Sequence, residues 1–240
     1  NNKDFRVGLS HAINRQEIVD YVLNGHGSIA DSGCPAFWPE TPGFNPNWQP
    51  DPYDQAKAKA LFAEAGYDDL SKVKVTMEIT PMGSTPFNEK INEAVALYWQ
   101  DLGLDVTMRK RDFASFQAGY INRVPAGETG GYAWVYPGPY RQWAVIGYNA
   151  CATTWGRYCM FGEYPEFDTI IGEAMAEASI ARRTELAREM GDFVYDNRII
   201  IGLGFSDQLW AVTPGLVWDS LPGGPSQGYL NNFDKLYWAE

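Results

Sequence analysis

A strand, a helix and a second strand follow one another between residues 73 and 110, and this succession restricts the fold more than any other feature. Residues 73–80 alternate apolar and polar side chains, which is the period of a half-buried strand. Apolar side chains then recur at helical spacing over 87–102, Gly103 stops the helix, and residues 104–110 alternate again. Two strands joined through a helix need a crossover, so we expect them to be parallel and the fold class to be α/β.

The flanking segments carry further helix and strand patterns. Helical stripes are expected within 1–24 (interrupted at Asn14), 54–66, 113–121, 167–178 and 186–194, and strands at 132–136, 199–205 and 209–212. The helix that Asp54 caps is expected to bury Ala56, Ala60, Leu61 and Ala65 and to end at Gly66. The sequence therefore predicts a three-layer α/β fold whose mostly parallel mixed sheet contains Val73–Thr80, Leu104–Lys110 and Tyr132–Tyr136.

The charge balance argues against a nucleic-acid partner. Nineteen Lys and Arg stand against 30 Asp and Glu, a formal net charge of −11, and the basic residues nowhere form the patch that a phosphate backbone needs. No run approaches the roughly 18 apolar residues of a membrane span. With 240 residues, we expect a soluble chain that is long enough for one sizeable core.

Metal sites and disulfide frameworks are also poorly supported. His11 and His26 are the only histidines, too few for a multi-histidine site, and no metal or cofactor is expected. Cys34, Cys151 and Cys159 lack the close pairing of zinc ligands. They allow either one disulfide with one thiol left over or three reduced thiols.

No arrangement typical of catalysis is present in the sequence. His11 lies beside an apolar helical stripe, and His26 lies between two glycines. Nothing near Cys34 would lower the pKa of its thiol, and the paired aspartates fall in turns and helix caps. We therefore expect a protein that is not an enzyme; a small α/β enzyme and a protein-interaction module that uses aromatic loops are the alternatives.

An aromatic and arginine cluster follows the last strand of the expected sheet. Aromatic residues make up 15% of the chain, and any single tryptophan is as readily a core residue as a ligand contact. As a group, these residues lie in loops at the carboxyl side of a strand, where ligands bind in open α/β sheets. Stacking rings and arginines suit a cleft for planar or sugar surfaces and for a carboxylate. The candidates are Trp134, Tyr136, Tyr140, Arg141, Trp143, Trp155 and Arg157.

Several segments in order resemble a known family. Residues 4–25, with the run AINR before Ile18, resemble the opening of the second lobe of family 5 extracytoplasmic solute-binding proteins, which serve ABC importers of peptides, nickel and related solutes. The run YDQAKAKALFAEAGY at 53–67 is similar to the family element "ydpekAkaLLaeAGy". Further likeness lies at 98–104, 165–171 and 194–203.

The resemblance implies the second lobe of a type II periplasmic-binding-protein clamp. Residues 1–213 would form the ligand-binding lobe, and the tail at 214–240 would return to a first lobe that precedes this chain in longer members. The protein would be a monomer, periplasmic or tethered outside a Gram-positive cell. It would deliver a peptide-like or oligosaccharide-like solute to a membrane permease. In an oxidising periplasm we expect a Cys151–Cys159 disulfide, with Cys34 unpaired.

One departure from the family bears on the solute. Peptide-binding members often carry an aspartate shortly after the strand tryptophan, where it pairs with the α-ammonium of the ligand. Here no acidic residue follows Trp134 until Glu163, while Arg141 and Arg157 lie between them. The sequence thus favours a neutral solute, such as an oligosaccharide, or an anionic one over a free amine.

Overall fold

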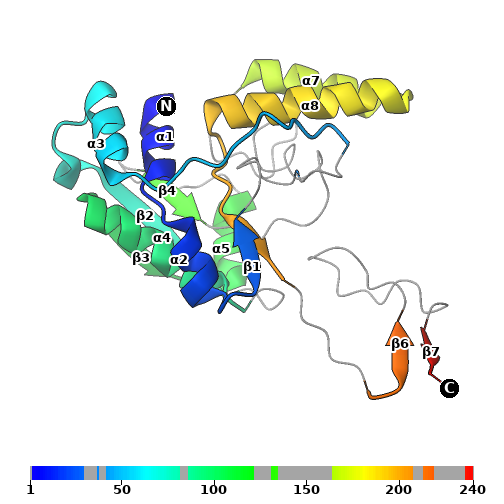
Figure 1. Ribbon diagram of the computed structural model, residues 1–240. Coiled ribbons are helices and arrows are strands. Elements are labelled where there is room, and N and C mark those ends of the chain that lie inside the picture. Colours follow the sequence, from blue (N-terminus) through cyan, green and yellow to red (C-terminus); the bar gives the residue numbers. More distant parts are fainter. Residues whose placement is uncertain are drawn as a thin grey trace.

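The computed structural model of the chain describes residues 2–29, 37, 42–81, 86–121, 131–134, 164–207, 213–218 and 236–239 (Figure 1). The helical elements are α1 (Lys3–His11), α2 (Arg15–Glu17), the π-helical η1 (Ile18–Val22), α3 (Gln55–Glu64), the 3₁₀ turn η2 (Leu70–Lys72), α4 (Asn88–Leu102), α5 (Phe113–Ile121), α7 (Pro165–Ala176) and α8 (Ile180–Asn197). The strands are β1 (Gly27–Ile29), β2 (Lys74–Ile79), β3 (Asp105–Lys110), β4 (Gly131–Trp134), β5 (Gly204–Ser206), β6 (Leu216–Trp218) and β7 (Leu236–Trp238).

A parallel sheet of order β3-β2-β4 forms the centre of the fold. Strand β2 pairs in parallel with both neighbours, so the predicted α/β sheet is confirmed. The crossover through α4 leads to one side of β2, and the crossover through α5 leads back to the other. The right-handed rule for such crossovers predicts α4 and α5 on opposite faces of the sheet, and α4 packs on β2 and β3.

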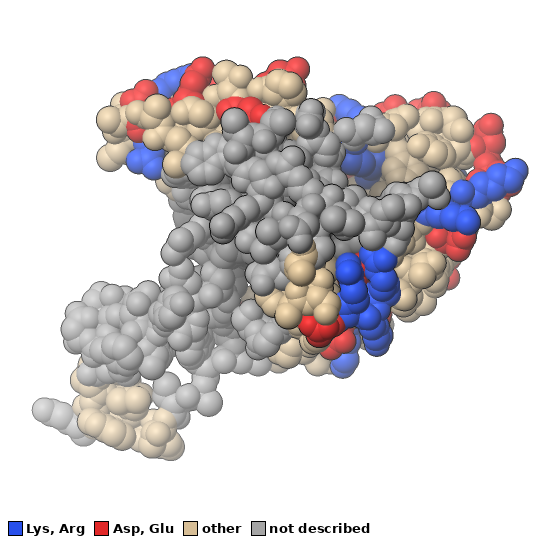
Figure 2. All heavy atoms as spheres, turned by 180° about the vertical axis from the view of Figure 1, so that it is seen from behind, with Lys and Arg blue, Asp and Glu red and all other residues tan. Residues whose placement is uncertain are grey.

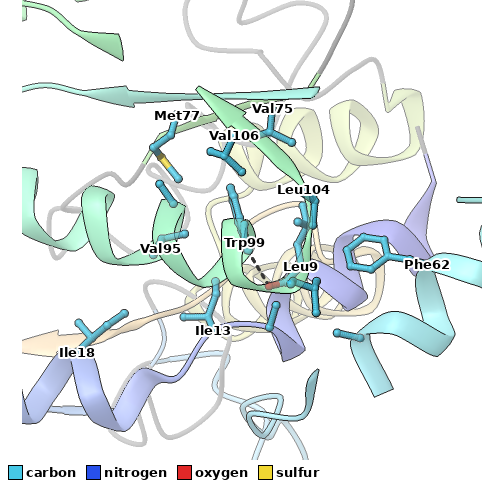
Figure 3. Close-up of a cluster of buried hydrophobic side chains, with 14 of the residues drawn as sticks. Leu9, Ile13, Ile18, Phe62, Val75, Met77, Val95, Trp99, Leu104 and Val106 are labelled. Carbon is cyan, nitrogen blue, oxygen red and sulfur yellow. Dashed lines mark hydrogen bonds between the residues drawn. The ribbon is translucent and has the colours of Figure 1, made fainter. Parts of the chain in front are cut away.

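The larger core lies between the sheet and helices α1, α3 and α4 (Figure 3). Met77 and Val106 from the strands meet Trp99 from α4, which is 4% exposed. The indole nitrogen of Trp99 donates a hydrogen bond of 3.1 Å to the backbone carbonyl of Leu9, so α4 is tied to α1 as well as packed on the sheet.

Helix α3 begins and ends as predicted but buries a different face. Asp54 caps it by accepting a hydrogen bond of 2.8 Å from the Lys57 backbone, and Gly66 follows with a φ of +86°. The prediction that Ala56, Ala60, Leu61 and Ala65 form the buried face is wrong, because the buried residues are Ala58 and Phe62. Burial of Phe62, whose ring lies 5.0 Å from that of Phe5, removes more apolar area from water than the alanines would, and this decides how the helix is rotated.

A second core lies under α7 and α8, which run side by side at the top of Figure 1. Phe37 and Trp48 pack there against Phe167 and Met190, and the Trp48 indole donates a hydrogen bond of 2.9 Å to Asp192. The two helices are confirmed. The expectation of one core is wrong for the described residues, because they form two separate buried clusters.

A buried charge network joins the two cores. Arg15, only 5% exposed, donates hydrogen bonds to the backbone carbonyls of Gly202 (2.8 Å), Ser10 (3.1 Å) and Asp51 (3.0 Å). The Asp51 carboxylate in turn accepts two hydrogen bonds, of 2.9 and 3.0 Å, from the Arg198 guanidinium. Segments that are far apart in the sequence are thereby fixed to one another.

The same network shifts the pKa values of its charged members. Burial lowers the pKa of Arg15 to about 10, although the negative charge of Asp51 opposes that effect. Burial alone would raise the pKa of Asp51. Hydrogen bonds from Arg198 and Ser10, together with the positive charge of Arg198, outweigh burial and hold the pKa of Asp51 below its ordinary value.

The strand predicted at 199–205 is wrong for most of its length, and it belongs to a different pair from the one predicted. Residues 199–203 are not a strand; β5 begins at Gly204 and pairs antiparallel with β1, with Gly27 opposite Ser206. In the residues before β5, the Gly202 carbonyl accepts a hydrogen bond from the Arg15 side chain instead of from a neighbouring strand. The other predicted strand, 209–212, lies outside the described residues.

We expect Gly191→Ala to destabilise the chain by about 1–3 kcal/mol, because a β-carbon at residue 191 would overlap the Trp48 ring. Gly172→Ala is the matched control in the neighbouring helix. A β-carbon there meets nothing within 4 Å, so this variant should be stabilised by about 0.5–1 kcal/mol. Urea unfolding of both variants measures the difference, and equal effects would contradict the packing described here.

We expect Asp51→Asn to lower the free energy of unfolding at neutral pH by about 3 kcal/mol, because a buried ion pair loses one partner. The folded pKa of Asp51 is depressed, so its stabilisation is present above about pH 5 and disappears as the pH falls through that lowered pKa. The difference between wild type and variant should therefore shrink in acid. Asp68→Asn, at an exposed residue, should match wild type throughout the pH series.

Candidate functional site

The carboxyl edge of the parallel sheet is the place where this topology favours a binding site. The chain leaves β2 toward β3 on one side and returns to β4 on the other, so its direction reverses between β2 and β4. In open α/β sheets ligands bind at such a reversal, outside the carboxyl ends of the strands. Residues 78–81, 109–112 and Trp134 lie at this edge.

Trp134 is the one predicted site residue that the structure describes. It is the last residue of β4, and the register places it opposite Glu78 of β2. Tyr136, Tyr140, Arg141, Trp143, Trp155 and Arg157 lie outside the described residues. So do Cys34, Cys151 and Cys159. The structure therefore places the start of the predicted cluster at the carboxyl edge and leaves the rest of it a prediction.

A buried carboxylate organises this edge. Glu78 is 0% exposed, and its register partner on β3 is Arg109. Glu78 forms an ion pair with Arg109 and accepts two hydrogen bonds from Arg111, 3.1 Å from Nε and 2.6 Å from Nη2. The Arg111 guanidinium also lies over the Phe116 ring of α5, 6.0 Å from its centre.

Burial of Glu78 corrects the expectation of a half-buried strand. Val75, Met77 and Ile79 face the core as predicted, but Glu78 and Thr80, on the polar alternate positions, are 0% exposed. A parallel sheet covered by helices on both faces buries both sets of side chains. A carboxylate in that position needs ionic partners, and Arg109 and Arg111 supply them.

A pocket of about 340 Å³ opens beside this network. Its lining residues are Ile79, Pro81, Glu89, Lys110, Arg111 and Asp112. Both signs of charge are present. Figure 2 shows such a mixture on the face turned away in Figure 1, where basic and acidic side chains lie directly beside one another.

The acidic and basic groups of the pocket differ in how they are held. Asp112 accepts a hydrogen bond of 2.9 Å from the Ser115 backbone, and the Ser115 hydroxyl donates another; these bonds lower the pKa of Asp112. Lys110 lies 2.7 Å from Glu93, a contact that raises the pKa of the lysine. Both shifts favour the charged forms of Asp112 and Lys110.

A buried polar layer borders the pocket where α4 begins. The Asn88 side chain donates a hydrogen bond of 3.0 Å to the Thr80 carbonyl, and that of Asn92 donates one of 2.7 Å to the Asn88 carbonyl. The Thr80 hydroxyl and the Asn88 side-chain oxygen are buried and have no hydrogen-bond partner among the described residues. The start of α4 thus buries polar side chains beside the apolar core, which Ile91 still contacts.

Sequence reasoning missed Glu78, Arg109 and Arg111. The available signal was a glutamate at the end of one strand and two arginines, two residues apart, at the end of the next. Once the strands are taken as parallel neighbours, equal distances from their ends place these residues side by side. Within the described residues, no group of three or more His, Cys, Asp or Glu is arranged to hold a metal ion.

Comparison with known proteins places the chain in a family of bacterial extracellular solute-binding proteins. The family model described as Bacterial extracellular solute-binding proteins, family 5 Middle, matches residues 1–149. The Nickel-binding periplasmic protein of Escherichia coli is 22% identical over 88% of this chain and 41% of its own length. Heme-binding protein A of Haemophilus influenzae is 27% identical over 55% of this chain and 23% of its own. The chain therefore spans well under half the length of these curated relatives.

Solved structures share the fold. The dipeptide binding protein from Pseudoalteromonas sp. SM9913 in complex with Met-Leu superposes with a TM-score of 0.67 at 18% identity, over 85% of this chain and 40% of that one. The unliganded open form of the murein tripeptide binding protein MppA gives a TM-score of 0.64 at 21% identity, over 90% and 41%. At these identities the likeness establishes the fold alone.

A double-mutant cycle tests the network at the carboxyl edge. We expect Glu78→Gln and Arg111→Gln to be non-additive, with a coupling energy of about 1–2 kcal/mol, because the side chains form two hydrogen bonds. The control cycle combines Glu78→Gln with Arg182→Gln, since Arg182 lies on the surface of α8 among Glu173, Glu185 and Glu189. Those two changes should add within about 0.5 kcal/mol in urea unfolding. Additivity in both cycles would contradict the network.

Proposed function

Because the chain belongs to the bacterial extracellular solute-binding proteins of family 5, we propose that it is the solute-binding lobe of an ABC importer's substrate-binding protein. The observation that carries the proposal is the carboxyl edge of the β3-β2-β4 sheet. There a topological reversal, a pocket and a fixed arginine pair coincide. In this role the chain binds and releases a solute without chemical change.

The proposed ligand wall runs from Trp134 along the aromatic segment that follows it. Trp134, Tyr136, Tyr140, Trp143 and Trp155 would stack on the solute, and Arg141 and Arg157 would hold an acidic or hydroxyl-rich group. Support comes from the place of Trp134 at the end of β4, beside Glu78 in the sheet register. The solute class is peptide-like or oligosaccharide-like, and the relatives' names favour the former by mentioning dipeptides.

We assign residues 1–213 to this lobe and residues 214–240 to a tail that packs on another lobe of a longer protein. The hairpin of β6 and β7 supports the assignment: Trp238 is 65% exposed and Tyr237 48% exposed. A two-stranded hairpin alone is marginally stable in water, so a further packing surface fits these side chains. The relatives' greater length leaves room for one.

The remaining partners follow from the family. A membrane permease would receive the solute from the closed two-lobed protein, outside the cytoplasmic membrane. Among the residues that the structure describes, no helix is long and apolar enough to cross a membrane. The protein itself would act as a monomer.

Solute binding is tested on the two-lobed protein purified without refolding. Native mass spectrometry identifies a co-purified solute, and calorimetry then compares Trp134→Ala, Trp155→Ala and Arg141→Ala with wild type. We expect at least one of the three to weaken binding by about tenfold or more, since each removes a stacking or ionic contact. Arg182→Ala, on the outer surface of α8, is the control and should keep wild-type affinity. If all three variants bind as wild type does, these aromatic residues belong to a core and not to the site.

The 240-residue chain by itself should bind the same solute weakly. One lobe leaves the far side of the ligand in water, which forfeits about half of a typical micromolar binding energy of about 8 kcal/mol. The dissociation constant should therefore rise to about a millimolar. Micromolar binding by the isolated chain would contradict the clamp and favour a complete site within this lobe.

A further inference from the structure

We infer that Asn24 is a site of spontaneous deamidation, and that the hydrogen bond from the Gly25 backbone to Val19 limits the rate of this reaction in the folded chain. Glycine follows asparagine at one place in the sequence, residues 24 and 25, and both residues are exposed. They form the turn between the helical segment α2–η1 and strand β1 (Figure 1). The inference goes beyond the proposed function and does not depend on which solute is bound.

The local sequence favours attack of the backbone on the asparagine side chain. In this reaction the backbone nitrogen of the following residue attacks Cγ of the asparagine, and a side chain on the following residue hinders that approach. Gly25 has no side chain, and an added β-carbon there would meet nothing within 4 Å. Neither a side chain at Gly25 nor a neighbour at that position therefore hinders the attack.

The reaction needs only water as a co-reactant. The Gly25 nitrogen loses its proton and forms a bond to Asn24 Cγ. The bond from Cγ to the side-chain nitrogen breaks, and that nitrogen leaves as ammonia with the proton. One water molecule then adds to the cyclic succinimide. Opening at one carbonyl gives aspartate at residue 24, and opening at the other gives isoaspartate.

The fold restrains the first step of this reaction. The Gly25 N–H donates a hydrogen bond of 2.9 Å to the Val19 carbonyl, across the end of η1. Asn24 and Gly25 both have positive φ angles, +53° and +77°, so the chain turns back and directs this N–H at the helix. Because a proton held in a hydrogen bond exchanges with solvent only after the bond opens, the Gly25 nitrogen cannot attack while the turn is closed.

Deamidation would change the turn that leads into β1. Gly27 of β1 pairs with Ser206 of β5, and a β-carbon at Gly27 would lie only 2.5 Å from the Phe205 carbonyl oxygen, so the two strands approach closely. Isoaspartate adds one atom to the backbone of the turn. Either product also places a negative charge at the carboxyl end of a helical segment, where the helix dipole disfavours it. The modification should therefore loosen β1 from β5.

The test compares two rates in the 240-residue chain at mildly alkaline pH. Peptide mapping by mass spectrometry, with fragmentation to locate the change, follows deamidation of Asn24 in the folded chain and in the chain unfolded in urea. Hydrogen exchange measured by NMR gives the protection factor of the Gly25 amide. We expect the folded chain to deamidate more slowly than the unfolded one by that protection factor, within about threefold, because one opening event exposes the same N–H in both experiments.

The control is Asn24→Gln, incubated in parallel, which keeps the side-chain amide but disfavours ring closure and should not be modified at residue 24. The deamidated chain, separated by ion exchange, should show lower hydrogen-exchange protection across β1 and β5 than the unmodified chain. The inference is overturned if Asn24 stays unmodified in the unfolded chain or reacts equally fast in the folded one. It is also overturned if the retardation differs from the protection factor by more than about threefold, or if the modified chain keeps full protection in β1 and β5.

Discussion

The buried guanidinium of Arg15 is the contact on which the arrangement of this chain depends. The two hydrophobic clusters share no strand and are formed by different parts of the sequence. Arg15 bonds to Gly202 beyond α8 and to Asp51 before α3, and Arg198 closes the network on the Asp51 carboxylate. Burying such a network costs free energy because its charges lose their hydration. Removing one member then strongly destabilises the folded protein, because the remaining charge is buried without a partner. Because hydrogen bonds have preferred directions, this network sets how the two clusters are oriented relative to each other. Apolar packing alone would define that orientation less specifically.

The parallel sheet creates the site by a similar constraint. Near the carboxyl end of β2 the polar alternate position is buried as well as the apolar ones, and the charge that Glu78 carries there must be paired. Glu78 is the residue that meets this requirement, by binding Arg109 and Arg111 where the strands end. Burial of one acid therefore fixes the positions of two arginines at this edge, where charges of both signs lie beside the pocket.

Family membership and the particular charges of this chain answer different questions. The family match and the superpositions show which fold the chain has and that relatives of this fold bind small solutes such as Met-Leu. They do not select a solute, since the relatives' names include nickel, heme and dipeptides. Different functions on one fold are set by the side chains of the site, and for this chain we propose that the site is the carboxyl edge of the sheet.

The sequence by itself determined the parallel strand–helix–strand unit, the helix caps at Asp54 and Gly103, the two late helices and the family, because these depend on local periodicity and on runs of adjacent residues. Tertiary structure decided which face of α3 is buried, since Phe62 outweighs the alanines only once Phe5 is beside it. It also decided that β5 pairs with β1 and that Glu78 is buried with two arginines. Each of these outcomes depends on residues distant in sequence, and a periodic pattern holds no information about what will cover its second face.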